Sequence, residues 1–585
     1  MRDVIFAMRT FWVLALPYFR SDDRWPGRAL LSGVIAAELG LVYVAVEVTY
    51  WNARFFNALE QRSWDLMTPE LLNFCLIVVG VILTNMAQYY FGQALTIRWR
   101  QWMTTRYVGI WMADGRHYRQ GFVDRSVDNI HLRIANDVFL FIQRTHELGT
   151  GLLGSVVALL SFAYMLWGIS AIMPLPLFGM NLAFPGYLIV LAMVFAASGT
   201  LIGHWIGKPL IPLQFDRQRY ESDFRFAIAR VTDHAEPVAL MGGEPVERAE
   251  LRRRFAALVI NWVQLIKRET RLIGFTSGYA QVSVAVPTLI GMPAYLAGAI
   301  PLGTLIQGGL AFNRVEGAFG FFLAMYRKIA EWKAIIDRLA QFEASMVEVD
   351  RTDRPGMAIR LTPSPDGQVA VNNMVLRVAN DNDVARVPNL QIAPGEHLLV
   401  TGPSGSGKSC LLRTIAGIWR FGEGSVSRPP GMRVLALPQR RYFPLGTLRQ
   451  AVTYPTPAEQ FTDAEIGAAI ETAGIGRLTH RLEEEADWSM VLSGGEQQRI
   501  GFARVLLHRP DLILLDEAVS TFDDADARDL YRMLFEKLPQ ATVISVGRSS
   551  VLAGLHRRSF DLGGSAQNSN RPPPAAAPAG AAAAT

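Results

Sequence analysis

The stretch EHLLVTGPSGSGKSCLLRTIAGIW, residues 396–419, places a glycine-rich loop between an apolar strand and a helix. Its central part fits the pattern G-x-x-x-x-G-K-[ST] in the strand–loop–helix context that this pattern requires. The glycines allow backbone N–H groups to close around phosphates, Lys408 reaches the β- and γ-phosphates, and Ser409 can hold Mg²⁺. We therefore expect a nucleotide to contact Gly402, Pro403, Ser404, Gly405, Ser406, Gly407, Lys408 and Ser409.

A second apolar stretch, DLILLDEAVS at residues 511–520, ends in two neighbouring carboxylates, Asp516 and Glu517. On a surface strand these would be ordinary solvated acids, but this strand is apolar throughout. We therefore expect both residues at the carboxyl edge of the sheet, beside the phosphate loop. Asp516 is suited to orient magnesium, and Glu517 to take a proton from the attacking water.

A third stretch, TVISVGRSSVL at residues 542–552, predicts a buried strand that stops at Gly547 and is followed at once by Arg548. A guanidinium at this sheet edge is a permanent, forked donor that can clamp a γ-phosphate. The alternative is that Arg548 turns to solvent or pairs with a carboxylate such as Asp523.

The first half of the chain has the composition of a membrane domain. Half of the 585 residues are hydrophobic, and the mean hydropathy of +0.19 is high for a soluble protein. Each of the apolar segments is long enough to cross about 30 Å of hydrocarbon. We expect six spans, at residues 29–50, 71–95, 148–172, 183–207, 272–297 and 302–325.

The basic residues predict the orientation of these spans. Residues 98–146 hold eight arginines and residues 208–271 hold twelve Lys plus Arg, while the linkers on the other side lack charge. The positive-inside rule then puts both basic loops and both termini in the cytoplasm. This accounts for the net charge of +5, and no motif indicates nucleic-acid binding. The two cysteines predict no disulfide, and the histidines show no metal-ligand spacing.

Two carboxylates, Glu38 and Glu47, fall inside the first predicted span. Unpaired carboxylates in lipid are costly, so both should face a bundle interior or a water-filled cavity. One interpretation is a substrate or proton site on the transport pathway. The other is that Glu47 lies at the outer interface and Glu38 belongs to a packing network.

The stretch VLSGGEQQRIGFARVLL, residues 491–507, indicates the family. It begins a helix whose free N–H groups and positive dipole suit a γ-phosphate. Its L-S-G-G-E-Q-Q-R motif resembles the signature of ATP-binding cassette (ABC) ATPases. Gln439 resembles the catalytic, metal-contacting glutamine of that family's Q-loop, and residues 520–523 resemble its D-loop. The resemblance implies nucleotide contacts from Ser493, Gly494, Gly495 and Glu496.

The resemblance extends over the whole chain. The membrane half is similar to the SbmA/BacA-type bacterial uptake proteins in the stretches PYFRSDDRW, FFNALEQ and VDNIHLRIANDV. The nucleotide half is similar to the subfamily-D peroxisomal fatty-acyl transporters and their relatives in the stretch LPQRRYFPLGTLRQAVTYP. It implies an α-helical six-span transmembrane domain plus an α/β P-loop nucleotide-binding domain. The expected parts are an amphipathic segment lying on the membrane surface at 1–28, a membrane domain with two long cytoplasmic hairpins at 29–340, a linker at 341–365, an ATPase domain at 366–562 and a disordered tail at 563–585.

In two respects the sequence departs from this family. Arg548 stands where the family has its switch histidine, which contacts the γ-phosphate and the attacking water. No Phe, Tyr or Trp lies between Phe342 and the phosphate loop, so the usual adenine-stacking aromatic is missing, and Arg377 is a candidate substitute. We expect ATP to bind, and the ATPase to be slow.

The family resemblance implies a homodimer in a bacterial inner membrane, in which two ATP molecules are each held between Lys408 of one chain and Ser493 of the other. The expected function is ATP- and Mg²⁺-dependent transport of hydrophilic or amphipathic solutes, peptide-like or vitamin-like, with uptake favoured. Two alternatives stay open. One is export of lipid-like or amphipathic compounds, and the other is a proton-coupled carrier with a slow or regulatory ATPase half.

Overall fold

The computed structural model describes residues 2–123, 130–173, 175–177, 180–182, 185–351, 358–364, 366–377, 383–547 and 552–562. The chain divides into two compact units. The first contains residues 1–107 and 129–340, and the second contains residues 108–128 and 341–585. Residues 108–128 therefore belong to the second unit, although the rest of that unit begins only at residue 341.

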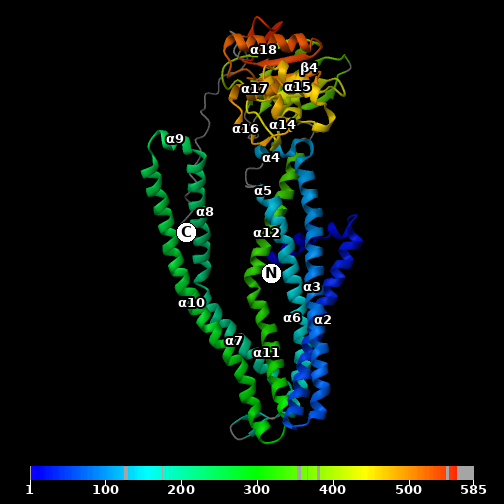
Figure 1. The fold of residues 1–585 in the computed structure, drawn as a ribbon, viewed down its shortest axis with the longest axis vertical. Helices are drawn as coiled ribbons and strands as arrows, with labels where there is room; N and C mark the ends of the chain where they lie inside the picture. Colours follow the sequence, from blue (N-terminus) through cyan, green and yellow to red (C-terminus); the bar gives the residue numbers. More distant parts are fainter. Residues whose placement is uncertain are drawn as a thin grey trace. The chain divides into compact units, whose positions relative to one another are not determined.

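The first unit is built from long helices (Figure 1). A short helix α1 and the single turn η1 precede them, and Tyr18 of η1 is fully buried with its ring stacked 5.6 Å from that of Trp99. The helices and turns of this unit are α1 (Arg2–Ala15), η1 (Tyr18–Arg20), α2 (Arg24–Glu60), α3 (Trp64–Met112), α5 (Ile130–Leu132), η3 (Arg133–Asp137), α6 (Val138–Ile172), α7 (Tyr187–Gly207), α8 (Leu210–Asp233), α9 (Ala235–Leu240), α10 (Glu244–Leu296), α11 (Leu302–Ala324) and α12 (Tyr326–Arg351).

Five helical segments among the described residues are long and apolar enough to cross a membrane: Arg24–Glu60, Trp64–Val123, Ile130–Ile172, Tyr187–Gly207 and Glu244–Leu296. They overlap the first five predicted spans, although the fourth helical segment begins at Tyr187 and the fifth ends at Leu296. The sixth predicted span forms α11, which is not among the five although it packs against α2, α6, α7 and α10. Four polar side chains lower its hydropathy: Gln307, Asn313, Arg314 and Glu316.

The core of the first unit lies where α6, α7, α10 and α11 meet. It contains fully buried aromatic and aliphatic side chains, among them Phe162, Leu166 and Phe312. Helix α3, in contrast, presents large apolar side chains outward, including Leu76 and Leu83. Apolar surface on a membrane-length helix is stable in contact with lipid, so this exposure is consistent with a bilayer around the unit.

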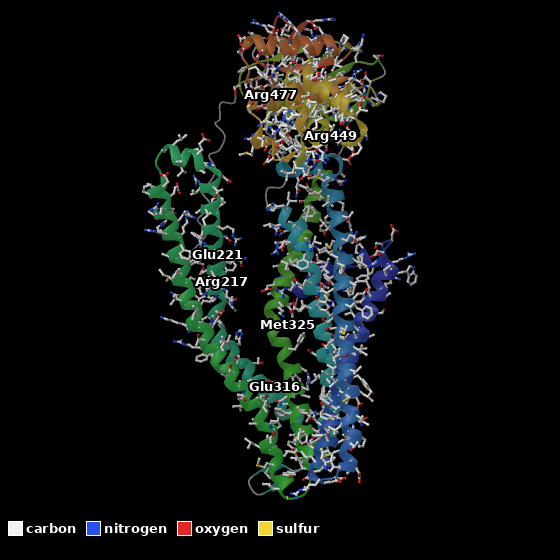
Figure 2. All side chains as sticks on the ribbon, in the orientation of Figure 1. Arg217, Glu221, Glu316, Met325, Arg449 and Arg477 are labelled. Carbon is white, nitrogen blue, oxygen red and sulfur yellow. The ribbon has the colours of Figure 1, made fainter. Side chains whose placement is uncertain are left out.

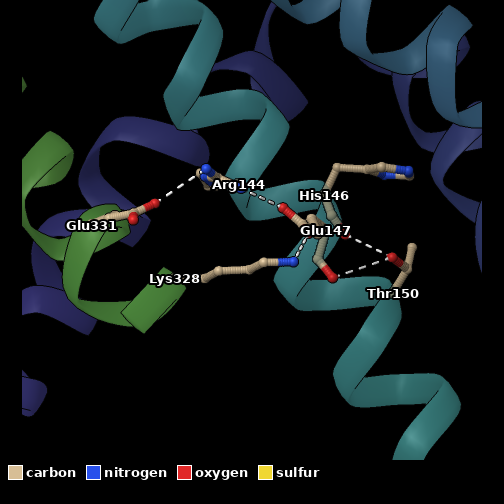
Figure 3. Close-up of polar contacts among 6 residues, drawn as sticks. All are labelled: Arg144, His146, Glu147, Thr150, Lys328 and Glu331. Atoms are coloured by element: carbon tan, nitrogen blue, oxygen red, sulfur yellow. Dashed lines mark hydrogen bonds and ion pairs between the residues drawn. The ribbon is translucent and has the colours of Figure 1, made fainter. Parts of the chain in front are cut away.

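Ion pairs fasten α12 to α6 within the first unit (Figure 3). Glu147 accepts from Arg144 at 2.8 Å and is paired with Lys328 of α12, while Arg144 also reaches Glu331 at 3.1 Å. These four charged groups compensate one another on two neighbouring helices, which favours a fixed register between α6 and α12.

The second unit contains two five-stranded sheets. One is fully parallel, in the order β14-β7-β13-β12-β9, and its three central strands are almost entirely buried. The other has the order β3-β8-β4-β5, with β6 also paired to β4. The strands are β3 (Arg360–Pro363), β4 (Val369–Arg377), β5 (Asp383–Val387), β6 (Leu390–Ile392), β7 (His397–Thr401), β8 (Gly422–Arg428), β9 (Val434–Leu437), β12 (Leu512–Asp516), β13 (Thr542–Val546) and β14 (Arg558–Asp561).

Helices and a short antiparallel pair of strands, β10 and β11, complete this unit. Helix α13 follows the phosphate loop, α14, α15 and α17 share a separate apolar core, and α18 packs on the parallel sheet. The elements are α13 (Lys408–Ala416), β10 (Gly446–Thr447), α14 (Leu448–Thr453), η4 (Ala458–Gln460), α15 (Asp463–Thr472), η5 (Gly476–Arg481), β11 (Glu485–Ala486), α16 (Trp488–Val491), α17 (Gly494–His508) and α18 (Asp524–Lys537).

Helix α4 (Arg116–Val123), preceded by the turn η2 (Ala113–Gly115), connects the end of α3 to the second unit. The ring of Phe122 lies 5.0 Å from that of Trp419 and 6.1 Å from that of Phe421. Arg116 forms a two-point ion pair with Asp350, at 2.8 and 3.1 Å. A segment that follows a membrane-length helix is thus part of the apolar core of the second unit.

Candidate functional site

The phosphate loop leaves the parallel sheet at the carboxyl end of β7. β7 is buried because its neighbours β13 and β14 pair with it on both sides, so the loop starts from a rigid strand. Gly405 and Gly407 adopt φ angles of +83° and +90°, a conformation that favours glycine. The predicted strand–loop–helix order is confirmed.

The lysine of the phosphate loop, Lys408, forms hydrogen bonds with the backbone of the same loop. The Lys408 ammonium donates to the carbonyl oxygens of Gly402 at 2.8 Å and Pro403 at 2.7 Å. Both acceptors are neutral, so the positive charge of the lysine is not compensated by them and stays available to an anion. The lysine is therefore positioned across the mouth of the loop, where phosphate oxygens would replace the carbonyl contacts.

Ser409 and Asp516 meet beneath the loop. The Ser409 hydroxyl donates to Asp516 Oδ1 at 3.0 Å, from the first turn of α13 to the last residue of β12. Asp516 is 7 % exposed. A hydroxyl and a carboxylate at this distance are oxygen ligands of the kind that Mg²⁺ accepts, together with phosphate oxygens and water. Among the described residues no group of three or more His, Cys, Asp and Glu side chains gathers to hold a metal alone.

Gln439 and Glu517 form the second pair at this edge. Gln439 donates its amide N–H to Glu517 Oε2 at 2.9 Å. Glu517 has a positive φ of 51°, and its backbone N–H donates to Val546 O at 2.9 Å, which fixes it against the end of β13. A non-glycine residue in this conformation is strained, and such strain is found where a side chain must be aimed at a site.

Of these side chains, Lys408 and Glu517 line a cavity of about 260 Å³. Its walls include the phosphate loop, Glu517, the segment 519–524 and the end of β13. The signature residues Ser493, Gly494, Gly495 and Glu496 do not line it. The structure thus brings together the phosphate loop, Asp516, Gln439 and Glu517, and none of Ser493, Gly494, Gly495 and Glu496 lines the cavity beside them.

The signature motif begins α17 with a capping box. The Ser493 backbone N–H donates to Glu496 at 2.9 Å, and the Glu496 N–H donates back to the Ser493 hydroxyl at 3.3 Å. The hydrogen bond from the Ser493 side chain, followed by the Arg477 ion pair at 2.6 Å, lowers the pKa of Glu496. These contacts satisfy the first turn of the helix, leaving Gly494 and Gly495 at its start without side chains that would block an approaching anion.

The signature helix is also tied to the D-loop. Gln498 is 2 % exposed, donates to the Ser520 hydroxyl at 3.2 Å, and accepts from Thr521. The sequence did not single out Gln498, although its place inside the signature motif was the available signal. This glutamine links the helix that begins at the signature to the loop that follows Glu517.

The sequence singled out two arginines near the nucleotide, Arg377 and Arg548, and the structure describes the first of them. Arg377, the candidate replacement for the adenine-stacking aromatic, forms ion pairs with Asp383 at 3.1 Å and Glu423 at 2.7 Å. Arg548, the candidate clamp, lies outside the described residues, and its role stays a prediction. The strand before it is confirmed, since β13 ends at Val546 with every residue buried.

In the first unit, Glu38 and Glu47 differ in their surroundings. Glu38 accepts from the Gln88 amide at 2.9 Å and lines a cavity of about 580 Å³ between α2, α6 and α11. Glu47 is half-buried and does not line this cavity. The two carboxylates that the sequence placed in one span therefore occupy different sites, and of the two Glu38 lines this cavity.

Two further charged residues of α11, Arg314 and Glu316, were not singled out from the sequence. Arg314 lines the same cavity as Glu38. Glu316, labelled in Figure 2, accepts from Tyr279 of α10 at 3.0 Å and lies 3.5 Å from the Ser283 hydroxyl. The signal was their position inside a predicted membrane span, the same criterion that identified Glu38.

Family models match both halves of the chain. The model "ABC transporter transmembrane region 2" matches residues 14–296, and the model "ABC transporter" matches residues 386–520. The chain is 31 % identical to an uncharacterized ABC transporter ATP-binding protein of Haemophilus influenzae over 95 % of this chain and 92 % of that protein. It is 30 % identical to the inner membrane ABC transporter ATP-binding protein YddA of Escherichia coli, over 91 % and 93 %.

More distant relatives include the human lysosomal cobalamin transporter ABCD4, 25 % identical over 89 % of both chains. Among solved structures, a bacterial Atm1-family ABC exporter with ATP bound aligns with a TM-score of 0.68 and 17 % identity, over 92 % of this chain and 93 % of that one. This last similarity concerns the fold. From the two matching models and the relatives that align along nearly its whole length, this chain belongs to the ABC transporter family, as a half-transporter whose ATPase domain couples ATP hydrolysis to transport across a membrane.

Proposed function

We propose that two copies of this chain form a homodimer that uses ATP and Mg²⁺ to take up hydrophilic or amphipathic solutes, peptide-like or vitamin-like. The observation that carries the proposal is the composition of the nucleotide cavity. Lys408, Asp516 and Glu517 are at one sheet edge, while the signature residues of the same chain do not line the cavity. A second copy supplies the missing signature, so that Lys408 of one chain and Ser493 of the other hold one ATP.

Each polar pair has a separate role in this mechanism. Lys408 neutralises phosphate charge, with the backbone of residues 402–407 around the phosphates. Ser409 and Asp516 would hold Mg²⁺, and Gln439 would contact the ion as well. Glu517 accepts the proton of the attacking water, and its hydrogen bond to Gln439 orients the carboxylate before the reaction. Arg548 clamps the γ-phosphate and slows turnover by binding the ground state as well as the transition state.

Measurement of oligomeric state and hydrolysis together tests this mechanism. A mixture of Lys408→Ala and Ser493→Ala chains contains mixed dimers in which one composite site has lost both groups and the other has lost neither. These mixed dimers should recover hydrolysis that neither pure variant shows. If both sites were built within one chain, mixing would recover nothing beyond the average of the two variants.

Uptake is supported by the resemblance to SbmA/BacA-type uptake proteins. A vitamin-like solute is supported by the similarity to a lysosomal cobalamin transporter. The proposed location is the bacterial inner membrane, as for the relative YddA, with both termini in the cytoplasm. Accumulation of labelled solute in right-side-out cells supports uptake, whereas ATP-driven accumulation in inverted vesicles identifies an exporter.

Export is the second candidate, and the fold similarity to an Atm1-family exporter favours it. A proton-coupled carrier is the third, favoured by the carboxylate Glu38 beside a cavity in the membrane unit. Transport that survives Glu517→Gln but is abolished by an uncoupler would identify the carrier. Transport that is lost in Glu517→Gln and survives the uncoupler supports the ATP-driven mechanism.

A further inference from the structure

The cavity in the membrane unit has walls of small side chains. It lies between α2, α6 and α11, and its volume is about 580 Å³. Gly151 and Gly154 of α6 and Gly317 and Gly320 of α11 are among its lining residues. A methyl group added at Gly151 would lie 2.6 Å from the Phe321 ring. These glycines therefore keep space open between helices that pack closely elsewhere.

Glu38 occupies one end of this cavity. Its Oε2 accepts from the Gln88 amide at 2.9 Å. Its Oε1 lies directly over Gly154, since a Cβ at that position would be 2.2 Å from this oxygen. One carboxylate oxygen is thus held by the protein, and the other faces a cavity wall that only glycine leaves open. This second oxygen is available to a donor or cation in the cavity.

Arg314 provides the opposite charge. It is exposed, lines the cavity, and makes no hydrogen bond or ion pair with any residue that the structure describes. It lies 11 residues along α11 from Gly303, about 16 Å into the helix. A guanidinium at this depth in a membrane domain is costly unless it faces a water-filled cavity and finds an anionic partner. The protein offers the cavity, and Glu316 on the same helix is engaged by Tyr279 instead.

The two charges stand at different depths. The Gly303 N–H donates to Asn57 at 2.8 Å, which aligns the outer end of α11 with α2. From this shared level Glu38 lies 19 residues inward on α2 and Arg314 lies 11 residues inward on α11. The difference of eight residues corresponds to about 12 Å along antiparallel helices at 1.5 Å per residue. The cavity therefore has an acidic end and a basic end.

We propose that this cavity is the solute-binding site and takes an amphoteric molecule whose cationic and anionic groups are roughly 10 Å apart. Glu38 binds the cationic group, and Arg314 binds the anionic group in a charge-assisted, forked contact. An extended tripeptide with free ends has this span, because each residue covers about 3.5 Å. The inference rests on the proposed transport function and specifies the substrate class for it.

The test uses the purified full-length protein in lipid nanodiscs, without nucleotide, and trialanine as the probe. Binding is measured by calorimetry for trialanine, its N-acetylated form, its C-terminal amide and the doubly blocked form. Removal of either charge should weaken binding by about tenfold or more, as expected for loss of a charge-assisted contact. Phosphoethanolamine, the charged part of a lipid headgroup, should not compete, because its two charges are too close together.

Variants then assign each charge to its partner. Glu38→Gln should remove the effect of N-acetylation and keep that of amidation, whereas Arg314→Gln should do the reverse, and Arg314→Lys should keep both. Glu47→Gln is the matched control on the same helix and should bind like the wild type. Thermal melting establishes that each variant is folded, and the wild-type series alone is decisive where a variant is not.

Three results would overturn the proposal: trialanine does not bind the wild type, the four forms bind equally, or phosphoethanolamine competes as well as trialanine. None of them bears on ATP-driven transport, which is tested separately by the mixed-dimer experiment on the nucleotide site. Failure of the mixed dimers with intact charge-selective binding would instead refute the proposed function and leave this binding site in place.

Discussion

The aromatic contact of α4 gives the sharpest prediction about coupling. Phe122 packs against Trp419, Phe421 and Tyr118, with ring centroids 5.0, 6.1 and 5.1 Å away. Truncation of a fully buried Phe to Ala costs about 3–5 kcal/mol. Phe122 is half-buried, so Phe122→Ala should weaken the packing of α4 on the rest of the second unit by roughly 2 kcal/mol, or about 30-fold in the equilibrium constant for this packing.

The expected result is a loss of coupling with a functioning ATPase. In nanodiscs, hydrolysis without solute should stay within about twofold of the wild type, because Phe122 is far in sequence from the phosphate loop and does not line its cavity. Transport, and stimulation of hydrolysis by solute, should both fall, by up to about 30-fold, the limit reached when unpacked α4 predominates in the variant and in the wild type.

Phe461→Ala is the matched control. Phe461 is also a half-buried phenylalanine of the second unit, but it packs against His508 at 5.2 Å and not against α4. If Phe122→Ala lowers basal hydrolysis and transport in the same proportion as Phe461→Ala does, its effect is general destabilisation, and the argument that α4 transmits the signal is refuted. Unchanged transport would refute it as well.

Four further predictions concern the ATPase domain. Lys408→Ala should abolish ATP-driven uptake, since its phosphate contact is worth several kcal/mol; uptake at the wild-type rate would contradict the mechanism. Glu517→Gln should keep ATP binding while hydrolysis falls by about 100-fold or more, and wild-type turnover in a phosphate-release assay would show that Glu517 is not the base. Arg548→Ala should weaken ATP affinity by about tenfold or more in a nucleotide titration, and an unchanged affinity would mean that Arg548 faces solvent. Burial lowers the pKa of His397, stacked 3.8 Å from Phe535, to about 4, so protonation favours the unfolded chain. The contribution of neutral His397 to the free energy of unfolding is complete above pH 6.5 and falls by up to about 2 kcal/mol by pH 5. In thermal melts at a series of pH values, His397→Phe should lose less stability on acidification than the wild type does. Parallel curves for the two proteins would contradict this prediction.

Local patterns predicted which side chains gather at the carboxyl edge of the parallel sheet. The phosphate loop, Asp516 and Glu517 each follow a buried strand, and parallel strands bring their carboxyl ends to one edge whatever the rest of the chain does. The pairs Ser409–Asp516 and Gln439–Glu517 join residues 107 and 78 positions apart. The first forms because β7 and β12 lie in the same sheet, and the second because β9 lies beside β12 in that sheet.

Features that depend on packing between distant helices were not predictable. Nothing in the letters of residues 108–128 indicates that Phe122 fits against Trp419. Arg314 and Glu316 are two positions apart on α11, and only the structure separates one that lines a cavity from one that bonds Tyr279. Glu47 and Glu38 look alike in sequence, yet only Glu38 finds a glycine-lined space beside it.

The spacing of Arg314 and Glu316 has a mechanical consequence. Residues two apart point to nearly opposite sides of a helix, about 200° around its axis. Helix α11 therefore has two different faces. Arg314 on one face lines the cavity, and Glu316 on the other face contacts Tyr279 and Ser283 of α10. A displacement of α10 that preserves these contacts would shift α11 with it, and would change the distance between Arg314 and α2 wherever α2 does not follow. Movement of α10 would thus change the shape of the cavity through α11, although no residue of α10 lines the cavity.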